Sequence, residues 1–404
     1  MPLLKLSEEQ VSLDLAIETL IALKQPFALY RLPGESEPYL LLQKDKKLRT
    51  FDSHEQLGAI SGFLMAPFNI SSDDPMVVLQ DDIKVHGLDN IAQYLEQEML
   101  SPAFSAYYQQ ISAKNCAEQI LFAHSQEDLW QEQQLQYQAD FATFHEALLS
   151  YQFDKLVLAT KRAFTYQPFK AWSSFVQACK LYPQMMVSLF SSDKTGTWFG
   201  ATPEILIKGK GEEFQTMSLA GTMLSADLTG YESHDLSSWS QKDKEEQEFV
   251  TDYIREVIAP YASNIQEQGP YMVAAGPVCH LRTDFHFTLK DEHSLGTLIG
   301  KLHPTPAVCG LPKQEAYEFI IKHETINRRY YSGMLGPLNL EQSSQIFVNL
   351  RCMEVHYEAP GKACAQVFAG GGNLRQSQCS LELQEACNKM RAICSAIVDV
   401  HKGE

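Results

Sequence analysis

An apolar strand that leads into three successive glycines is the feature that most constrains how this 404-residue chain can fold. Residues 367–373 read Val-Phe-Ala-Gly-Gly-Gly-Asn, and a helical pattern follows at about residues 380–395. Glycines let a backbone approach a ligand closely, and a run of bare N–H groups suits an anion. The segment therefore predicts either an anion-binding loop or an ordinary connection between a strand and a helix.

Two carboxylates and an ammonium share one face of the helix after the glycines. Glu382, Glu385 and Lys389 stand at i, i+3 and i+7, which places them on one side of a helix. An anion-binding backbone beside paired carboxylates is electrostatically unfavourable unless a divalent cation lies between them. A solvated helix face is the alternative explanation of this spacing.

The composition argues against several classes of partner. Lys and Arg number 33 against 50 Asp and Glu, and the net charge of −17 disfavours nucleic acid or an anionic membrane. Nine cysteines without a Cys-x-x-Cys pair favour a reducing compartment over a disulfide scaffold or a zinc site. Neither a secretory signal nor a membrane-spanning apolar run is found. We therefore expect a soluble, globular, cytoplasmic protein.

Strand-like and helix-like patterns are mixed along the chain, without a Rossmann or P-loop fingerprint. Alternation predicts a strand at 155–160, and an apolar stripe predicts a helix at 242–260. Residues 88–112 and 141–151 also have helical patterns, whereas the Gln-rich and Glu-rich segment 126–138 indicates an exposed connection. These patterns favour an α+β fold with largely antiparallel sheets covered by helices.

Lys155 and Glu204 are candidates for acid–base chemistry. Lys155 opens the strand Lys-Leu-Val-Leu-Ala-Thr, and Glu204 follows a Gly-Ala-Thr-Pro turn at the head of an apolar strand. Each could be an exposed residue at a strand end. If buried, the lysine could act as a general base and the glutamate as a general acid with a raised pKa.

Three further charged or titratable residues stand near apolar segments. Glu246 precedes Phe249 and Val250 by one turn, so its carboxylate leans toward a buried face and calls for a partner such as a metal ion. Arg351 ends the strand Ile-Phe-Val-Asn-Leu and could clamp a carboxylate, or it could be an exposed strand-end residue. A buried histidine is more often a structural residue with satisfied hydrogen bonds than a ligand, and His280 could be either.

Ten segments, taken in order, resemble the chorismate-utilising enzymes, and isochorismate synthase most closely. They are KLVLATKR (155–162), GATPEILI (200–207), SLAGT (218–222), KDKEEQEFV (242–250), CHLRT (279–283), LHPTPAVCG (302–310), YYSGMLG (330–336), IFVNLRC (346–352), VFAGGG (367–372) and the Glu382, Glu385 and Lys389 face. The resemblance covers about residues 150–395. It implies one large α+β domain over 1–404, with two antiparallel sheets packed as a sandwich, flanking helices and residues 1–140 as a variable N-terminal part.

The resemblance also implies a reaction and a role for each candidate residue. Chorismate would become isochorismate when water adds at C2 and the C4 hydroxyl leaves, with Lys155 as base and Glu204 as acid. Mg²⁺ would bind the ring carboxylate and be held by Glu246, Glu382 and Glu385. The enolpyruvyl carboxylate would be held by Arg351 and the backbone of Gly371 and Gly372. The remaining pocket neighbours would be Thr222, His280, Tyr331 and Lys389.

The resemblance favours water over ammonia as the nucleophile. The ammonia-using members of the family lack a lysine at the position of Lys155, and one branch carries a lysine where this chain has Ala220. The implied protein is a monomer without a glutaminase partner, serving menaquinone or siderophore biosynthesis. A salicylate synthase, an ammonia-using synthase and a non-catalytic scaffold are the alternatives. The chain departs from the family pattern at Gln247, at Ala386 and over 373–380.

Overall fold

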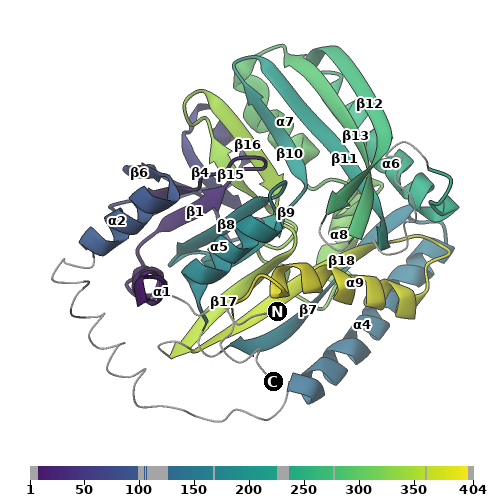
Figure 1. The fold of residues 1–404 in the computed structure, drawn as a ribbon. Coiled ribbons are helices and arrows are strands. Elements are labelled where there is room, and N and C mark those ends of the chain that lie inside the picture. Colours follow the sequence, from purple (N-terminus) through teal and green to yellow (C-terminus); the bar gives the residue numbers. More distant parts are fainter. Residues whose placement is uncertain are drawn as a thin grey trace.

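The computed structural model describes residues 8–98, 104, 106, 126–166, 169–224, 236–275, 278–359 and 362–398. Within these residues, two nine-stranded sheets are built from antiparallel pairs (Figure 1). The first sheet has the order β14 (Gly310–Leu311), β7 (Lys155–Tyr166), β18 (Lys362–Asn373), β17 (Cys352–Ala359), β9 (Gly196–Thr202), β8 (Met186–Ser192), β1 (Phe27–Arg31), β2 (Tyr39–Leu42) and β6 (Ile83–His86). The second has the order β12 (Ala262–Ala275), β13 (Val278–Leu289), β11 (Glu213–Leu224), β10 (Ile205–Lys210), β16 (Ser343–Val348), β15 (Met334–Leu338), β4 (Gly62–Ala66), β5 (Met76–Leu79) and β3 (Arg49–Phe51).

The helices of the described residues surround these sheets. They are α1 (Glu8–Ala22), α2 (Leu88–Glu98), α4 (Gln126–Leu149), α5 (Ala171–Leu181), α6 (Gln241–Ile258), α7 (Leu295–Leu302), α8 (Lys313–His323) and α9 (Cys379–Cys394), with short 3₁₀ turns at His54–Ala59 and Glu292–Ser294. The predicted α+β class with two antiparallel sheets and flanking helices is therefore confirmed. None of these helices is both long and apolar enough to cross a membrane.

The space between the sheets is filled by large apolar side chains from both. Phe190, Trp198 and Phe368 come from the first sheet, and Phe63 and Phe347 come from the second. Successive side chains of a strand point to opposite faces, so each strand contributes about every second residue to this layer. The alternation in the sequence arises from this packing.

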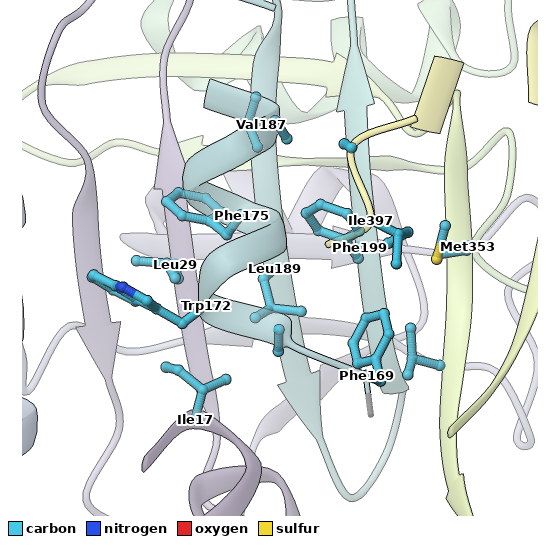
Figure 2. Close-up of a cluster of buried hydrophobic side chains, with 14 of the residues drawn as sticks. Ile17, Leu29, Phe169, Trp172, Phe175, Val187, Leu189, Phe199, Met353 and Ile397 are labelled. Atoms are coloured by element: carbon cyan, nitrogen blue, oxygen red, sulfur yellow. The ribbon is translucent and has the colours of Figure 1, made fainter. Parts of the chain in front are cut away.

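Helices bury the outer faces of the sheets. Figure 2 shows Trp172 and Phe175 of α5 directed at Leu29, Val187 and other side chains of the first sheet. Phe175 is fully buried, and burying an aromatic side chain of this size contributes about 2 kcal/mol. The outer face of the second sheet is covered in the same way by the apolar stripe of α6, while α4 and α8 pack against β7.

The N-terminal strands belong to both sheets. β1, β2 and β6 end the first sheet, and β3, β4 and β5 end the second. β1 pairs with β8 over residues 27–31, so strands more than 150 residues apart form one continuous sheet. The early part of the chain thus completes both layers of the sandwich.

Two sequence expectations about local structure are wrong. Residues 126–138 are the first half of the 24-residue helix α4, whose buried Trp130 and Tyr137 stand among polar residues that favour helix formation. The three glycines lie within β18, paired with β7 from Gly370↔Ala159 to Gly372↔Val157, and do not form a loop. The helix expected at 88–112 begins as predicted but α2 ends at Glu98, and all later residues of that range except 104 and 106 lie outside the described part.

Candidate active site

A pocket lies where the β7–β18 end of the first sheet meets β11 and β13 of the second, beside α6 and α9. Its walls contain most of the candidate residues, namely Glu204, Glu246, His280, Tyr331, Arg351, Gly372 and Lys389. Apolar groups complete the lining, among them Val157, Leu219 and Phe368. Ten separate segments of the chain therefore supply one pocket that contains several charged side chains.

Lys155 is buried completely at the first residue of β7. Its Nζ lies 2.9 Å from Glu246 Oε1 on α6, and the carboxylate is nearly as buried. The ammonium makes no hydrogen bond of good geometry within the described residues. Burial alone would raise the pKa of Glu246, but attraction to Lys155 and Lys242 outweighs it, so this pKa lies below its ordinary value. Glu246 is therefore negatively charged.

Glu204 has the opposite electrostatic character. The residue is 4% exposed, and burial raises the pKa of its carboxyl group to about 7 despite the charge of Lys155 and a hydrogen bond from Thr305 Oγ1 at 3.3 Å. The carbonyl of Glu204 accepts from Val348 N, which fixes the backbone at the head of β10. A carboxyl group with this pKa can hold a proton near neutral pH and donate it.

Arg351 is buried rather than exposed at its strand end. It lies between β16 and β17 with a backbone φ of 48°, a conformation that few residues other than glycine adopt without strain. Its Nη2 lies 2.7 Å from His280 Nε2, and His280 Nδ1 lies 2.7 Å from the carbonyl oxygen of Gly221. Burial and Arg351 lower the pKa of His280 to about 3, so the ring is neutral. A neutral ring that donates from Nδ1 accepts from Arg351 at Nε2 and holds the guanidinium at the pocket wall.

The glycines of β18 provide space for neighbouring side chains. A Cβ atom at Gly372 would lie 2.5 Å from Glu246 Oε1 and 2.7 Å from Lys155 Cε. At Gly371 it would lie 3.3 Å from Glu382 Oε2 and at Gly370 2.9 Å from the hydroxyl of Tyr331. Only glycine lets the strand run this close to the carboxylates.

The α9 face carries two carboxylates in different environments. Glu382 is 3% exposed and its Oε1 lies 2.7 Å from Lys242 Nζ of α6. Burial and the neighbouring Glu385 raise the pKa of Glu382, although Lys242 opposes this. Glu385 Oε1 lies 2.7 Å from Lys389 Nζ, which also donates to the carbonyl of Gly370 at 2.9 Å.

These carboxylates fit a divalent cation by their chemistry. Among the described residues, Glu382 Oε2 is buried without a hydrogen bond of good geometry, although Ser377 lies close by, and the missing side chain of Gly371 leaves room for this oxygen. Anionic oxygens are the ligands that Mg²⁺ prefers. Among the described residues, no three or more His, Cys, Asp or Glu side chains are grouped so that they could hold a metal ion. The glutamates are held instead by lysines.

The candidate residues from the sequence line the pocket or lie next to residues that line it, except that the side chain of Thr222 is not described. Thr222 lies in β11, but its side chain is outside the described part of the structure. Tyr331 is buried, and its ring stacks on Phe368 with the centroids 5.5 Å apart.

Three residues near the site were not singled out from the sequence. Lys242 stands one turn before Glu246, and Thr305 lies in the LHPTPAVCG segment beside Glu204. Gln247, noted only as a departure, accepts from Ala220 N at 2.9 Å and donates to Ser218 Oγ at 2.8 Å. It thereby anchors β11 at the bulge that follows Ala220. The i, i+4 spacing of Lys242 and Glu246 was the signal that could have revealed the lysine.

Glu204, whose pKa lies near neutrality, and Arg351 line this pocket, and Lys155 pairs with the lining residue Glu246. Groups of this kind can transfer protons and bind an anion. A family model described as "Chorismate binding enzyme" matches residues 53–398. The chain therefore belongs to this family of chorismate-utilising enzymes.

Three curated relatives are 27% to 29% identical to this chain over the aligned segments. The salicylate biosynthesis isochorismate synthase of Pseudomonas aeruginosa is 29% identical over 68% of this chain and 57% of its own length. Isochorismate synthase EntC of Escherichia coli is 29% identical over 44% of this chain and 45% of its own length. For isochorismate synthase MenF of Bacillus subtilis the identity is 27%, over 61% and 52%. The chain thus spans about half the length of the curated relatives it matches.

Solved structures share the fold over almost the whole chain. The putative 2,3-dihydroxybenzoate-specific isochorismate synthase DhbC from Bacillus anthracis gives a TM-score of 0.69 at 18% identity, covering 96% of this chain and 99% of its own. Menaquinone-specific MenF from Escherichia coli gives 0.66 at 17% identity, over 94% and 90%. Component I of anthranilate synthase from Streptococcus pneumoniae gives 0.61 at 16% identity, over 91% and 89%. At these identities the likeness concerns the fold.

Proposed function

We propose that this protein is an isochorismate synthase, which adds water at C2 of chorismate while the C4 hydroxyl leaves. The observation that carries the proposal is that Glu204, whose pKa lies at about 7, lines a pocket whose wall also holds Glu246, the partner of buried Lys155 at 2.9 Å. The reaction needs a base for the attacking water and an acid for the departing hydroxyl group. Lys155 takes the first role in this proposal and Glu204 the second.

The substrate is a dianion, and the proposed binding groups match its two carboxylates. Arg351, held by His280, and the backbone of Gly371 and Gly372 bind the enolpyruvyl carboxylate. Thr222, Tyr331 and Lys389 are the other proposed pocket contacts. His280 acts through Arg351 in this arrangement, since both ring nitrogens face protein groups.

Glu246, Glu382 and Glu385 are the proposed ligands of Mg²⁺. When bound, the ion would offset the charge of the ring carboxylate and fix the ring in position. Lys155 would accept a proton from the attacking water in its unprotonated form, while Glu246 would serve as a ligand of the ion. The orphaned Glu382 Oε2 and the space beside Gly371 support this ligand set.

The test is to incubate the purified protein with chorismate and MgCl₂ and to identify the product by chromatography. Isochorismate is expected, without pyruvate release and without dependence on ammonium. Salicylate with pyruvate would instead establish a salicylate synthase, and an aminated product would establish an ammonia-using enzyme. Absence of turnover with either nucleophile would leave a non-catalytic scaffold. The product is proposed to serve menaquinone or siderophore biosynthesis.

A further inference from the structure

Each proposed metal-binding carboxylate is paired with a different lysine. The three N···O distances are 2.9, 2.7 and 2.7 Å for Lys155–Glu246, Lys242–Glu382 and Lys389–Glu385. The six groups come from β7, α6 and α9 and carry three charges of each sign. The cluster is therefore close to neutral before any divalent cation binds, and a cation that bound without displacing an ammonium would meet strong repulsion.

Lys242 is less firmly held beside its carboxylate than the other two lysines. Lys155 is fully buried, and Lys389 is held by the carbonyl of Gly370 as well as by its carboxylate. The side chain of Lys242 is 23% exposed, and Glu382 is its one ion-pair partner among the described residues. A long side chain at the edge of a site can change rotamer and extend into water without moving its helix.

The Lys242 ammonium contacts Glu382 and lies within the electrostatic influence of the other two carboxylates. It lies 2.7 Å from Glu382 Oε1, and it projects from α6 one turn before Glu246. The negative charges of Glu382, Glu246 and Glu385 all act on it. Among the residues that the structure describes, the second oxygen of Glu382 is buried and makes no hydrogen bond of good geometry. Glu382 thus has one oxygen paired with the Lys242 ammonium and a second, buried oxygen that has only Ser377 nearby.

We propose that the ammonium of Lys242 occupies the cation position of the metal-free enzyme, and that Mg²⁺ binds by displacing it from Glu382. The inference rests on the proposed metal role of Glu382. An ion pair of this kind keeps a buried carboxylate compensated when the metal is absent, because an unpaired buried charge is strongly destabilising. The same pair weakens the apparent affinity for Mg²⁺, since the Lys242–Glu382 contact must break first.

The test measures binding of MgCl₂ to the metal-free full chain by isothermal titration calorimetry, without chorismate and at constant ionic strength. Lys242→Met should bind Mg²⁺ about tenfold more tightly than the wild type, the size expected for losing one partly exposed ion pair and one nearby positive charge. Lys244→Met is the matched control, because it removes the same charge from the same helix. It should change the dissociation constant by less than about threefold.

A second measurement distinguishes displacement from general damage to the site. Mg²⁺ should raise the melting temperature of Lys242→Met by more than that of the wild type, because the unpaired Glu382 regains a cation. Lys242→Arg keeps a positive charge beside Glu382 and should bind Mg²⁺ no more tightly than the wild type. This variant can still be measured if Lys242→Met folds poorly.

The possible outcomes separate this inference from the proposed function. If the wild type binds Mg²⁺ and Lys242→Met binds it with the same or lower affinity, displacement of Lys242 is wrong while the metal site stands. If Glu382→Gln binds Mg²⁺ as the wild type does, the metal role of Glu382 is wrong and the inference falls with it. Tighter binding in Lys242→Met that disappears in the Lys242→Met, Glu382→Gln double variant supports both.

Discussion

The buried ammonium of Lys155 lies 2.9 Å from the carboxylate of Glu246, so the proposed base and a proposed metal ligand neutralise each other in the metal-free site. This pairing explains how a lysine can be buried completely at the start of β7.

Replacing Lys155 with Met is expected to lower kcat by about 10² or more, the usual effect of losing a general base. The KM for chorismate should change less, because Arg351 and the β18 backbone are untouched. Steady-state kinetics with product identification would measure both values. Lys161→Met, on the same strand but directed at the ring of Phe368, is the control and should retain activity within about threefold. Equal losses in both variants would remove Lys155 from the role of base.

Glu204 should make stability depend on pH in a predictable direction. Its pKa is about 7 in the folded protein against 4.5 as the ordinary value, so between these pH values the folded state holds a proton that the unfolded state releases. The free energy of unfolding should therefore fall as pH rises through this window, by about 2 to 3 kcal/mol from this group.

Glu204→Gln provides the comparison for this prediction, since the amide does not titrate. Urea unfolding of both proteins from pH 5 to pH 8 should show the wild type losing stability relative to the variant by that amount. Other titrating groups are common to both proteins and cancel in the difference. A difference that is constant over this range would show that the Glu204 carboxyl group has an ordinary pKa.

The buried pair of Glu324 and Arg328 is predicted to be essential for stability. Arg328 Nε lies 2.6 Å from Glu324 Oε2, and Glu324 Oε1 accepts from the backbone N–H of Ala159 at 2.7 Å. Arg328 also donates to the carbonyl of Val157 at 2.8 Å. The pair thus satisfies backbone groups on the edge of β7 beyond its short pairing with β14. Glu324→Ala should cost about 3 to 5 kcal/mol, because it leaves a buried guanidinium without its partner.

Denaturant unfolding would measure this loss against an exposed ion pair. Arg255, which contacts Glu267 and Asp252 at the surface, is the control, and Arg255→Ala should cost no more than about 1 kcal/mol. A cost for Glu324→Ala as small as that of the surface variant would contradict the assigned role of the pair.

Local patterns predicted elements whose buried faces are regular. The stripe of Val250, Ile254 and Ile258 marked α6, and alternation marked the start of β7. The beginning of α4 was missed because Trp130 and Tyr137 are its main apolar signals within a Gln-rich and Glu-rich segment. Sheet order could not be read from the sequence, since β7 pairs with a strand about 200 residues later and no local signal encodes that partner.

The site was predictable in its residue types but not in its pairing. Glu204 and Glu246 could be recognised because charged residues next to apolar strands or helix faces need a partner. Which partner each received depends on tertiary packing, so the Lys242–Glu382 contact between α6 and α9 left no pattern of its own. The glycines were expected to expose backbone to a ligand, whereas in the structure their missing side chains also make room for Glu246 and Lys155.

The consecutive glycines Gly371 and Gly372 should respond differently to the same substitution. In Gly372→Ala the new Cβ would lie 2.5 Å from Glu246 Oε1 and 2.7 Å from Lys155 Cε, a clash with both members of a buried ion pair. In Gly371→Ala it would lie 3.3 Å from Glu382 Oε2, which needs only a small shift. We expect kcat to fall by about 10² or more in the first variant, as for loss of an acid–base group, and by about tenfold or less in the second.

Kinetics at several MgCl₂ concentrations would separate the two effects. Gly371→Ala should mainly raise the Mg²⁺ concentration needed for half-maximal rate, because it disturbs Glu382, whereas saturating Mg²⁺ should not restore Gly372→Ala. Each variant adds one methyl group to the same strand, so the two are matched in the size of the change. Circular dichroism and the melting temperature would verify that both fold. The reverse order of activity would mean that the Lys155–Glu246 pair tolerates displacement and that the space beside Gly371 is the more critical one for turnover.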